Sequence, residues 1–538
     1  MLASIAFPPL LAAPAKILIA LAVGLAVEAS PALAAPTADG DFDGDGRSDL
    51  AIGAPADSVN GVPGAGAVNV LYGARDGLTE VGDEQFTKLP QRIAGAPQPD
   101  ARFGAALAAG DLDDDGFADL AIGAPGEDVG ALRDAPASGA VTVLYGSAGG
   151  LVTRPAAGSW TQNGIGIKGG AEQGDRFGAA LAIGDFDDDR RGDLAIGVPG
   201  EGVGAAANAG AVNVLYGRSS GLHEAGDQLW TQNTRGIKGL AGAGHRFGAA
   251  LAAGDLSRNA RAELAIGIPG GAISGQGEAG AVSVLYGRST GLSSTDDLWS
   301  QDARGIKGVA ASGEGFGSAL AIGDFDGDRS GDLAIGIPRD DVGNATGAGA
   351  VSVLYGTGIG LREEGDQRWT QESPGIRSRA SIGETFGASL AAADFSRNGA
   401  DDLAIGVPRQ GVSGHLNAGA VSVLYGRRGE GLRAVSNHLW TQDAAGIKGR
   451  AERDDRLGDA LATGDFDGDG AFDLAIGVPG DGVAGFASAG AANVLYGTAA
   501  GLSEHDDGLW TQATSGIKGA VGDDRLGSAL ASGTAADD

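Results

Sequence analysis

Residues 177–199 read FGAALAIGDFDDDRRGDLAIGVP, and near-copies of this stretch return along the whole 538-residue chain. In a full copy an acidic loop lies between an F-G pair and a G-x-P element, and the aspartates that open these loops are 69 to 74 residues apart. These loop-opening residues are Asp41, Asp111, Asp185, Asp255, Asp324, Asp394 and Asp465. Self-similarity at a fixed period is the signature of a repeat architecture, so the sequence predicts one structural unit used seven times.

Each repeat contains four short segments typical of β-strands. In the third repeat they are Phe177–Ala182, the L-A-I-G run at 194–197, the A-V-N-V-L-Y run at 211–216 and the residues around W-T-Q at 230–232. Gly, Asn and Asp stand at the junctions, and these are the residues that tight turns require. No ten-residue stretch of the repeats shows the period of an amphipathic helix, so we expect an all-β fold.

Four strands form a small sheet that cannot bury both of its faces alone. Radial stacking of such sheets around an axis buries the faces and protects the edges. We therefore predict a seven-bladed β-propeller over residues 36–538.

The two ends of the repeated region predict how the ring closes. The first acidic loop, at Asp41, has no F-G strand before it, whereas the last F-G-like pair, Leu526-Gly527, has no acidic loop after it. The C-terminal strand within residues 523–533 is therefore expected to complete the first blade beside Ala51–Gly53. A ring closed in this way leaves no exposed sheet edge.

Several side chains recur at one position of the repeat. All seven tyrosines share one slot, and all six tryptophans share another, held by Phe86 in the first repeat, which we expect to serve packing. The F-G position holds Phe103, Phe177, Phe247, Phe316, Phe386, Leu457 and Leu526, which either wedge the blades together or line a rim that grips a partner. A basic residue follows the Trp segment at Lys168, Lys238, Lys307, Arg377, Lys448 and Lys518, either as a solvated strand-end charge or as part of a cationic ring for an anionic sugar or carboxylate.

Residues 1–35 differ in composition and are predicted to be a secretory signal peptide. Ile17–Val27 is an apolar run of eleven residues, which is short for a bilayer span, and Ala32-Leu33-Ala34 provides a cleavage pattern. An uncleaved membrane anchor is the alternative. No later stretch is apolar over a spanning length, so we expect the mature chain to have no membrane span and to be secreted or held in a bacterial cell envelope.

The composition argues against several classes of function. The chain has no Cys, which excludes disulfides, thiolate metal sites and cysteine nucleophiles. A formal net charge of −31 argues against a nucleic-acid partner, because an acidic surface repels phosphates. The five histidines share no repeat position and are expected at the surface, and no nucleophile elbow, zinc-protease motif or phosphate loop occurs. The sequence therefore favours a protein that is not an enzyme.

The acidic loops carry candidate metal ligands. In the first loop, Asp41, Asp43, Asp45 and Asp49 place carboxylates at positions 1, 3, 5 and 9, and a backbone carbonyl is available at position 7. Alternate side chains of a tight loop converge on one point, and this many hard oxygen ligands suit Ca²⁺ better than the stricter octahedron of Mg²⁺. The alternative is an Asx-turn without metal.

Five loops carry all four carboxylates and are expected to be good Ca²⁺ sites with a structural role. Besides the first loop they consist of Asp111, Asp113, Asp115 and Asp119; Asp185, Asp187, Asp189 and Asp193; Asp324, Asp326, Asp328 and Asp332; and Asp465, Asp467, Asp469 and Asp473. The loop of Asp394, Ser396, Asn398 and Asp402 keeps its oxygens but loses charge, so a weaker site is expected there. The loop of Asp255, Ser257, Asn259 and Glu263 is a doubtful site.

The F-G and G-x-P pairs with acidic loops between them resemble the FG-GAP repeats of the integrin alpha-chain β-propeller. Phe103-Gly104 with Gly123-Ala124-Pro125 carries this signature in the second repeat. The resemblance covers about residues 36–538 and is stronger to bacterial FG-GAP proteins, because nearly all repeats here carry the loop. It implies a seven-bladed propeller with Ca²⁺ in loops on a lower face, protein partners on an upper face, and a role in adhesion or recognition.

These observations lead to one main functional hypothesis and two alternatives. The main hypothesis is an exported binding module for adhesion or surface recognition, expected to be a monomer, which takes an extracellular protein or glycan ligand on its upper face. The upper-face loops are the most divergent segments between repeats, which fits a binding face, although loop drift explains the same pattern. They are Ala56–Pro63, Gly126–Ala137, Glu201–Asn208, Gly270–Glu278, Arg339–Gly347, Arg409–Asn417 and Asp481–Ser488.

The first alternative is a glycan-active hydrolase or lyase with its site on the upper face or in the axial channel. It needs acids such as Glu127 and Asp128, or Asp340 and Asp341, to converge. The second alternative is a lectin-like module with one sugar site in each blade.

Overall fold

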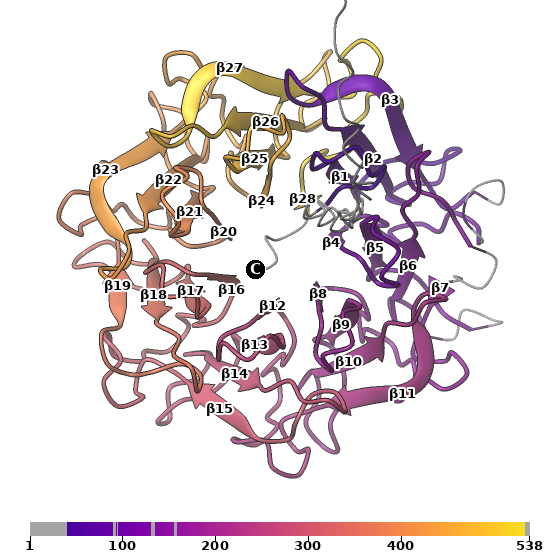
Figure 1. The fold of residues 1–538 in the computed structure, drawn as a ribbon, viewed down its shortest axis with the longest axis vertical. Coiled ribbons are helices and arrows are strands. Elements are labelled where there is room, and N and C mark those ends of the chain that lie inside the picture. Colours follow the sequence, from indigo (N-terminus) through magenta and orange to yellow (C-terminus); the bar gives the residue numbers. More distant parts are fainter. Residues whose placement is uncertain (1–39, 90–92, 94, 131–134, 155–158, 533–538) are drawn as a thin grey trace, which may run out of the picture. The chain divides into compact units, whose positions relative to one another are not determined.

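Seven four-stranded antiparallel sheets stand as blades around a central axis in the computed structural model of the chain (Figure 1). The structure describes residues 40–89, 93, 95–130, 135–154 and 159–532. The predicted all-β, seven-bladed propeller is therefore confirmed. The signal peptide predicted at residues 1–35 lies outside the described residues.

The strands of each blade run from the axis outward. Blade 1 consists of β28 (Ala529–Ala531), β1 (Leu50–Ala54), β2 (Ala67–Tyr72) and β3 (Thr79–Phe86). Blade 2 consists of β4 (Ala106–Gly110), β5 (Asp119–Ala124), β6 (Ala140–Leu144) and β7 (Ser159–Trp160). Blade 3 consists of β8 (Leu181–Gly184), β9 (Asp193–Val198), β10 (Ala211–Tyr216) and β11 (His223–Trp230).

The remaining four blades repeat this order. Blade 4 consists of β12 (Leu251–Gly254), β13 (Glu263–Ile268), β14 (Ala281–Leu285) and β15 (Asp296–Trp299). Blade 5 consists of β16 (Ala319–Gly323), β17 (Asp332–Ile337), β18 (Ala350–Leu354) and β19 (Gln367–Trp369). Blade 6 consists of β20 (Leu390–Ala393), β21 (Asp402–Val407), β22 (Ala420–Tyr425) and β23 (Arg433–Trp440). Blade 7 consists of β24 (Leu461–Gly464), β25 (Asp473–Val478), β26 (Ala491–Tyr496) and β27 (Ser503–Trp510).

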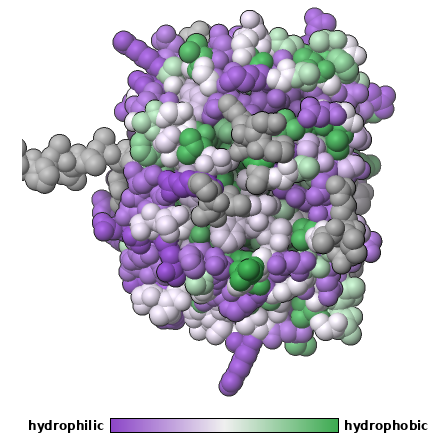
Figure 2. Space-filling model, turned by 90° about the vertical axis from the view of Figure 1, so that its right-hand side faces the viewer, coloured by the Kyte–Doolittle hydropathy of each residue, from purple (hydrophilic) through white to green (hydrophobic). Residues whose placement is uncertain are grey.

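Because neighbouring strands are antiparallel, the connections of a blade lie alternately at its two ends. The acidic loops join the first strand of a blade to the second, and we call this end the lower face. The loops after G-x-P join the second strand to the third, and they lie at the opposite end, the upper face. Seen from the side, hydrophilic residues dominate the surface and hydrophobic ones are scattered (Figure 2), as on most solvent-exposed protein surfaces.

The middle strands of each blade are buried along their whole length, as in β9 and β10, whereas the outer β11 is partly exposed. Each blade packs against two neighbours, so both faces of its middle strands are covered and their sequences are continuous apolar runs. The close approach also explains part of the high glycine content. A Cβ atom on Gly197 would lie 2.1 Å from the carbonyl oxygen of Gly248 in the next blade.

Two predicted strand boundaries are wrong. The first strand of blade 3 begins at Leu181 instead of Phe177, because Gly178 has a φ of 83° and turns the chain there. Phe177 instead forms an isolated parallel bridge with Gly139 of the preceding blade. The fourth strand ends at Trp230, and the T-Q residues after it belong to a turn in which Thr234 N–H donates to Thr231 O.

The F-G side chains wedge the blades together. Phe103, Phe177, Phe247, Phe316, Phe386, Leu457 and Leu526 are all at most 1% exposed. Phe177, for example, packs in one cluster with Val141 of blade 2 and Ile196 of blade 3. The alternative expectation, a rim that grips a partner, is therefore wrong for these residues, because none reaches solvent.

The hydroxyl groups of six of the seven tyrosines tie consecutive blades together, which explains the shared slot. The Leu222 N–H of blade 3 donates to Tyr145 Oη of blade 2 over 3.0 Å. The same bond links Leu292 to Tyr216, Leu432 to Tyr355 and Leu502 to Tyr425. Leu78 donates to Tyr496 over 3.1 Å, so this tie also joins blade 7 to blade 1.

The lysines that follow the Trp segment form a second tie between blades, while their side chains stay half-exposed, as expected for solvated strand-end charges. The backbone N–H of Lys168 donates to Asp227 Oδ2 of the next blade over 2.7 Å, and its Nζ lies 3.3 Å from Oδ1. The aspartate is 3% exposed in its side chain, whereas the lysine is half-exposed. Equivalent pairs are Lys238–Asp296, Lys307–Asp366, Lys448–Asp507 and Lys518–Asp83, the last of which joins blade 7 to blade 1.

Replacing Lys168 by Met is expected to lower the free energy of unfolding by about 1–2 kcal/mol, because the buried Asp227 carboxylate then keeps only its backbone donor. Equilibrium urea unfolding measures the loss, and Asp227→Asn alone provides the second edge of a double-mutant cycle. Blade 6 has Asn437 in the aspartate position opposite Arg377, which shows that an amide fits there. A coupling energy near zero in the cycle would contradict a stabilising interaction between Lys168 and Asp227.

The C-terminal strand closes the ring as predicted. Residues 51, 52 and 53 of β1 pair with Ala531, Leu530 and Ala529 of β28 in antiparallel register. Gly527 N–H also donates to Gly53 O over 3.0 Å. The strand therefore supplies the inner edge of blade 1, and the axial cavity of about 240 Å³ is lined by the inner strands of all blades, including Leu530 and Ser532.

Candidate metal sites

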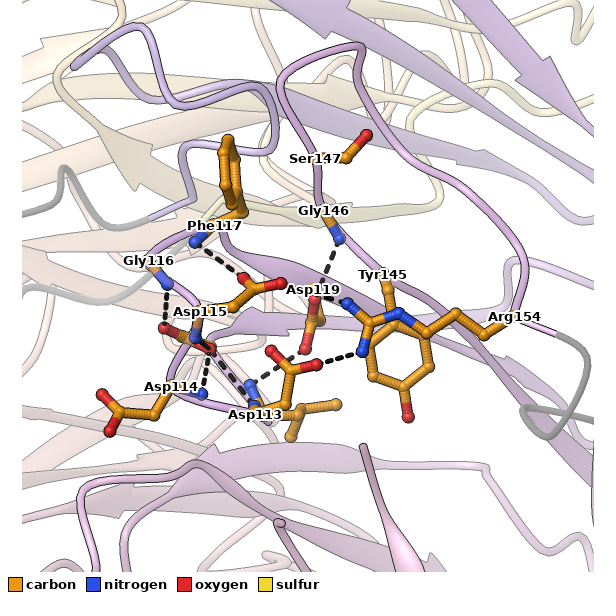
Figure 3. Close-up of polar contacts among 12 residues, drawn as sticks. Asp113, Asp114, Asp115, Gly116, Phe117, Asp119, Tyr145, Gly146, Ser147 and Arg154 are labelled. Atoms are coloured by element: carbon orange, nitrogen blue, oxygen red, sulfur yellow. Dashed lines mark hydrogen bonds and ion pairs between the residues drawn. The ribbon is translucent and has the colours of Figure 1, made fainter. Parts of the chain in front are cut away.

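Each acidic loop is held by its own first and last acids. In the loop of blade 2, Asp111 Oδ1 accepts the N–H of Asp114 over 2.7 Å, and Asp111 Oδ2 accepts the N–H of Gly116 over 2.9 Å. Asp119 accepts the N–H of Leu112 over 3.0 Å and that of Gly146, after the third strand, over 2.9 Å (Figure 3). The loop is thereby pinned to the blade at both ends.

Three carboxylates converge in each of the five loops that carry the full acidic set. Within each trio the candidate ligand oxygens lie within 4.8 Å of one another. At Asp41 and Asp111 the trio comprises positions 1, 3 and 5, and in the other three loops it comprises positions 1, 3 and 9. The trios are Asp41, Asp43 and Asp45; Asp111, Asp113 and Asp115; Asp185, Asp187 and Asp193; Asp324, Asp326 and Asp332; and Asp465, Asp467 and Asp473.

The predicted ligands outside these trios have other partners. Asp189 forms an ion pair with Arg191 at 2.8 Å, whereas Asp328 and Asp469 accept the N–H groups of Ser330 and Ala471. Asp49 and Asp119, at position 9, are fully buried and accept two backbone N–H groups each.

Burial makes the position-9 carboxylates costly to ionise without a nearby positive charge. Desolvation raises the pKa of Asp119 to about 8, although the N–H groups of Gly146 and Leu112 lower it, and the nearby Asp113 adds to the rise. The pKa of Asp49 and of Asp193 is raised to about 8 in the same way. A bound divalent cation would reverse this effect, because it favours the charged form.

Two buried carboxylate oxygens point to a missing ligand. Asp113 Oδ1 and Asp187 Oδ1, both at position 3, are inaccessible to solvent and have no hydrogen-bond partner among the described residues. Buried polar atoms are almost always satisfied, so these oxygens fit a cation that completes the trio. Arg154 supplies a positive charge at the edge of the blade 2 loop, where it contacts Asp113 and lies 3.0 Å from Asp115 (Figure 3).

The two weakened loops contain side-chain donors, although Asp402 Oδ2 of the blade 6 loop is buried without a hydrogen-bond partner among the described residues. In blade 4, Ser257 Oγ donates to Glu263 Oε1 over 3.0 Å, and Asn259 Nδ2 donates to Ser257 Oγ over 2.5 Å. In blade 6, Asn398 Nδ2 donates to Ser396 Oγ over 2.7 Å. In both loops the Asn side chain thus donates to the Ser hydroxyl at position 3.

The acids considered for glycan chemistry do not form a free pair. Asp340 is 3% exposed and binds Arg368 at 2.6 Å, whereas Asp341 accepts the N–H of Gly347 in its own loop. Glu127 forms an ion pair with Lys88, and the remaining acid of that loop, Asp128, accepts the N–H of Ala137. Each of these acids thus has another partner, and these contacts give no catalytic assignment.

Two histidines are not the surface residues that the sequence predicts. His438 lies on β23 and hydrogen-bonds through Nδ1 with Tyr425 Oη at 2.8 Å, while His245 Nδ1 lies 2.9 Å from Gln232 Oε1. Burial lowers the pKa of both imidazoles. Both therefore serve packing between strands and blades.

A set of acid pairs on the upper face was missed by the sequence reading. One acid stands two residues before the F-G position and the other two residues after the proline of G-x-P, so they meet only when the blade forms. The pairs are Asp524 with Asp57, Asp175 with Glu201, Glu314 with Asp340, and Asp455 with Asp481. Aligning the repeats by these two positions would have revealed them.

Replacing Asp57 by Asn is expected to stabilise the protein at pH 7.5. Burial, and then the charge of Asp524, raise the pKa of Asp57 to about 6, so the folded state holds a proton that the unfolded chain releases near pH 4. Stability from this group is complete below about pH 4 and is lost as the pH rises through 6. The gain at pH 7.5 is about 1–3 kcal/mol and shrinks at pH 5.

Urea unfolding with saturating calcium at both pH values checks this expectation. Asp76→Asn, on the exposed side chain of Asp76, is the control with the same change of charge. A lower stability of Asp57→Asn than of the parent at pH 7.5 would show that the pair is not repulsive.

Seven four-stranded blades with acidic loops on one face define a repeat β-propeller with a series of candidate cation sites. The family model for the FG-GAP repeat matches residues 34–71, 103–144, 177–215, 247–285, 316–354, 386–424 and 457–495, which together make up about half of the chain. The chain therefore belongs to the FG-GAP repeat family.

Known relatives include proteins of different activity. The chain is 38% identical over 176 residues to integrin alpha-PS2 of Drosophila melanogaster, which covers 32% of this chain and 11% of that protein. It is 35% identical over 167 residues to phosphatidylinositol-glycan-specific phospholipase D of Rattus norvegicus, which covers 30% of this chain and 18% of that protein. The chain thus matches less than a fifth of the length of either relative.

Among solved structures, the exotype rhamnogalacturonan lyase YesX is similar over 91% of this chain and 70% of that chain, with 14% identity and a TM-score of 0.34. We draw no functional conclusion from a likeness at this level. In the part of the chain that the structure describes, no helix has the length and apolar character needed to cross a membrane.

Proposed function

We propose that the chain is an exported, calcium-binding β-propeller that acts as a binding module for adhesion or surface recognition. The observation that carries the proposal is the convergence of three carboxylates in each of five acidic loops of an FG-GAP propeller. The similarity to integrin alpha-PS2 supports a recognition role, and the A-x-A pattern after Ile17–Val27 supports export.

Calcium is the cation that the loops suit best. Each trio offers hard carboxylate oxygens on a flexible loop, and Ca²⁺ accepts six to eight such ligands with variable geometry. The ligands would be the members of the five trios, and the metal would stabilise the connection between the first and second strands of a blade. The loop of Asp394, Ser396, Asn398 and Asp402 would hold a sixth, weaker site, and the loop of Asp255 a doubtful one.

The upper face is the proposed ligand face, and the ligand is an extracellular protein or glycan. Its loops connect the second and third strands, and they differ between repeats while the strands that carry them stay constant. The metal loops are at the opposite end of the blades, so calcium supports the fold without occupying this face.

An array of extracellular proteins and glycans, probed with the secreted chain in calcium and scored for both binding and turnover, tests this role. Binding without turnover supports the recognition module. Turnover of a glycan that Asp340→Ala abolishes would replace it with the hydrolase or lyase. A stoichiometry near seven sugars per chain would instead indicate the lectin-like module.

A further inference from the structure

Arginines gather on the upper face of a chain whose net charge is −31. In five repeats the residue directly before the F-G position is an arginine, namely Arg102, Arg176, Arg246, Arg456 and Arg525. These positions lie four or five residues before the inner strands, at the upper ends of the blades. All but the half-buried Arg246 are exposed, and no side-chain hydrogen bond or ion pair joins any of the five to another described residue.

These five arginines occupy a backbone conformation that disfavours a side chain. Their φ angles lie between 56° and 60°, in the left-handed region. A non-glycine residue there carries a local strain, and blade 5 shows that Gly315 fits the same position with a φ of 71°. The backbone is fixed, since Arg176 N–H donates to Ala137 O over 3.1 Å and Arg102 N–H to Gly64 O over 3.0 Å. The fold alone therefore does not account for arginine at these sites.

The two blades that lack this arginine supply one from another position. Blade 5 has Gly315 and blade 6 has Thr385 before the F-G pair, and these same blades carry Arg339 and Arg409 directly after G-x-P. The guanidinium of Arg339 reaches the vacant position, because a Cβ atom on Gly315 would lie 3.0 Å from Arg339 Nη2. Every blade thus has one arginine directly before the F-G position or directly after G-x-P, and we call these seven residues the arginine ring. Arg339 Nη2 also lies 3.7 Å from Glu278 Oε2.

The arginines of neighbouring blades lie close enough to act on one anion. Asp459, at the start of the inner strand of blade 7, is influenced by the positive charges of Arg456, Arg409 and Arg525 from three consecutive blades. Between Arg102 and Arg525 the upper face is hollowed into a cavity of about 610 Å³. Asp100 and Asp523 also line it, and no ion pair joins either to these arginines in the described residues.

We propose that the arginine ring binds a carboxylate-bearing polysaccharide. This inference rests on the proposed recognition function and names the ligand class of its upper face. Guanidinium groups match carboxylates in a two-pronged geometry, and a ring of seven suits a polymer that presents one acid per repeat. The cavity is lined by Gly, Ala, Ser, Pro, Asp and Arg, without an aromatic or large apolar side chain, so it offers no pocket for the apolar anchors that dominate protein interfaces.

The test compares two sets of glycine variants that change charge and strain alike. The ring variant carries Arg102→Gly, Arg176→Gly, Arg456→Gly and Arg525→Gly. The control carries Arg190→Gly, Arg258→Gly, Arg329→Gly and Arg397→Gly, which remove four arginines with φ between 51° and 72° from the acidic loops of the lower face. Binding to immobilised hyaluronate, dextran and poly-L-glutamate is measured in calcium at about 0.1 M salt.

The parent and the control are expected to bind hyaluronate but not dextran, and the ring variant to bind it at least about tenfold more weakly. The ring variant should melt no lower than the parent, because glycine relieves the strain. Equal hyaluronate binding by ring variant and control, or no binding by the parent, would overturn the proposal. Tighter binding of poly-L-glutamate than of hyaluronate would assign the ring to an acidic protein segment instead. The melting temperature of the ring variant should depend on calcium as that of the parent does. This measurement shows whether the ring proposal or the metal proposal has failed.

Discussion

Removal of calcium is expected to lower the melting temperature of this protein by about 10–20 °C. A ligand at a concentration one hundredfold above its dissociation constant stabilises the folded state by about 2.7 kcal/mol per site, and five sites act together. Without the cation, each loop leaves three converging carboxylates to repel one another. Calorimetry of the chain with calcium and with an excess of a calcium chelator measures the shift.

Single-loop variants connect the shift to particular residues. Asp187→Ala removes the position-3 carboxylate whose Oδ1 is buried without a partner, so it should reduce the calcium stoichiometry by one and shrink the chelator-induced shift. Ser257→Ala alters the same position of the blade 4 loop and should leave the stoichiometry unchanged. A melting temperature that does not respond to chelation would refute the metal proposal for all five loops.

The propeller and its closure could be predicted from the sequence because both depend on the order of the repeats. The F-G segment is lacking before Asp41, and one more stands at Leu526-Gly527 than there are loops to follow it. Only one arrangement then pairs every strand, and the register of β1 with β28 confirms it. The convergence of carboxylates in the acidic loops could also be predicted, since these acids lie within nine residues and a tight turn brings such neighbours together.

Contacts between blades could not be predicted in the same way. Lys168 and Asp227 are 59 residues apart, and their meeting depends on how far one blade is rotated against the next. The same holds for Tyr145 with Leu222. Asp57 and Asp524 meet within blade 1, but they come from opposite ends of the chain. Period and composition mark such residues as recurrent, but only the packed ring shows what each one contacts.

The boundary errors have a related cause. The F-G segment has the apolar alternation of a strand, yet Gly178 in the left-handed region interrupts it, and Phe177 is left to bridge to the preceding blade. Strand propensity therefore gave way to packing between blades. The same packing buries the Phe ring completely, which leaves the arginines beside it as the side chains that reach solvent.

Truncation after Asp524 is expected to have an effect as large as the loss of calcium. It removes Leu526 and the strand β28, in which Leu530 and Ala531 lie, and all three side chains are at least nine-tenths buried. It also removes the hydrogen bond from Gly527 N–H to Gly53 O. Burial of two leucines and pairing of the strand contribute about 5 kcal/mol or more, which is comparable with the whole stability of many domains. The exposed edge of β1 should also make the protein self-associate.

Truncation after Ser532 is the matched control, because it shortens the C-terminus and keeps β28. Hydrogen exchange should show fast exchange of the β1 amides only in the shorter chain, and size-exclusion chromatography should show oligomers only there. A synthetic peptide of residues 523–533 should restore protection, since the ties from Lys518 to Asp83 and from Tyr496 to Leu78 still hold blade 7 against blade 1. If the two truncated proteins melt at the same temperature, those two ties alone close the ring and the strand is dispensable.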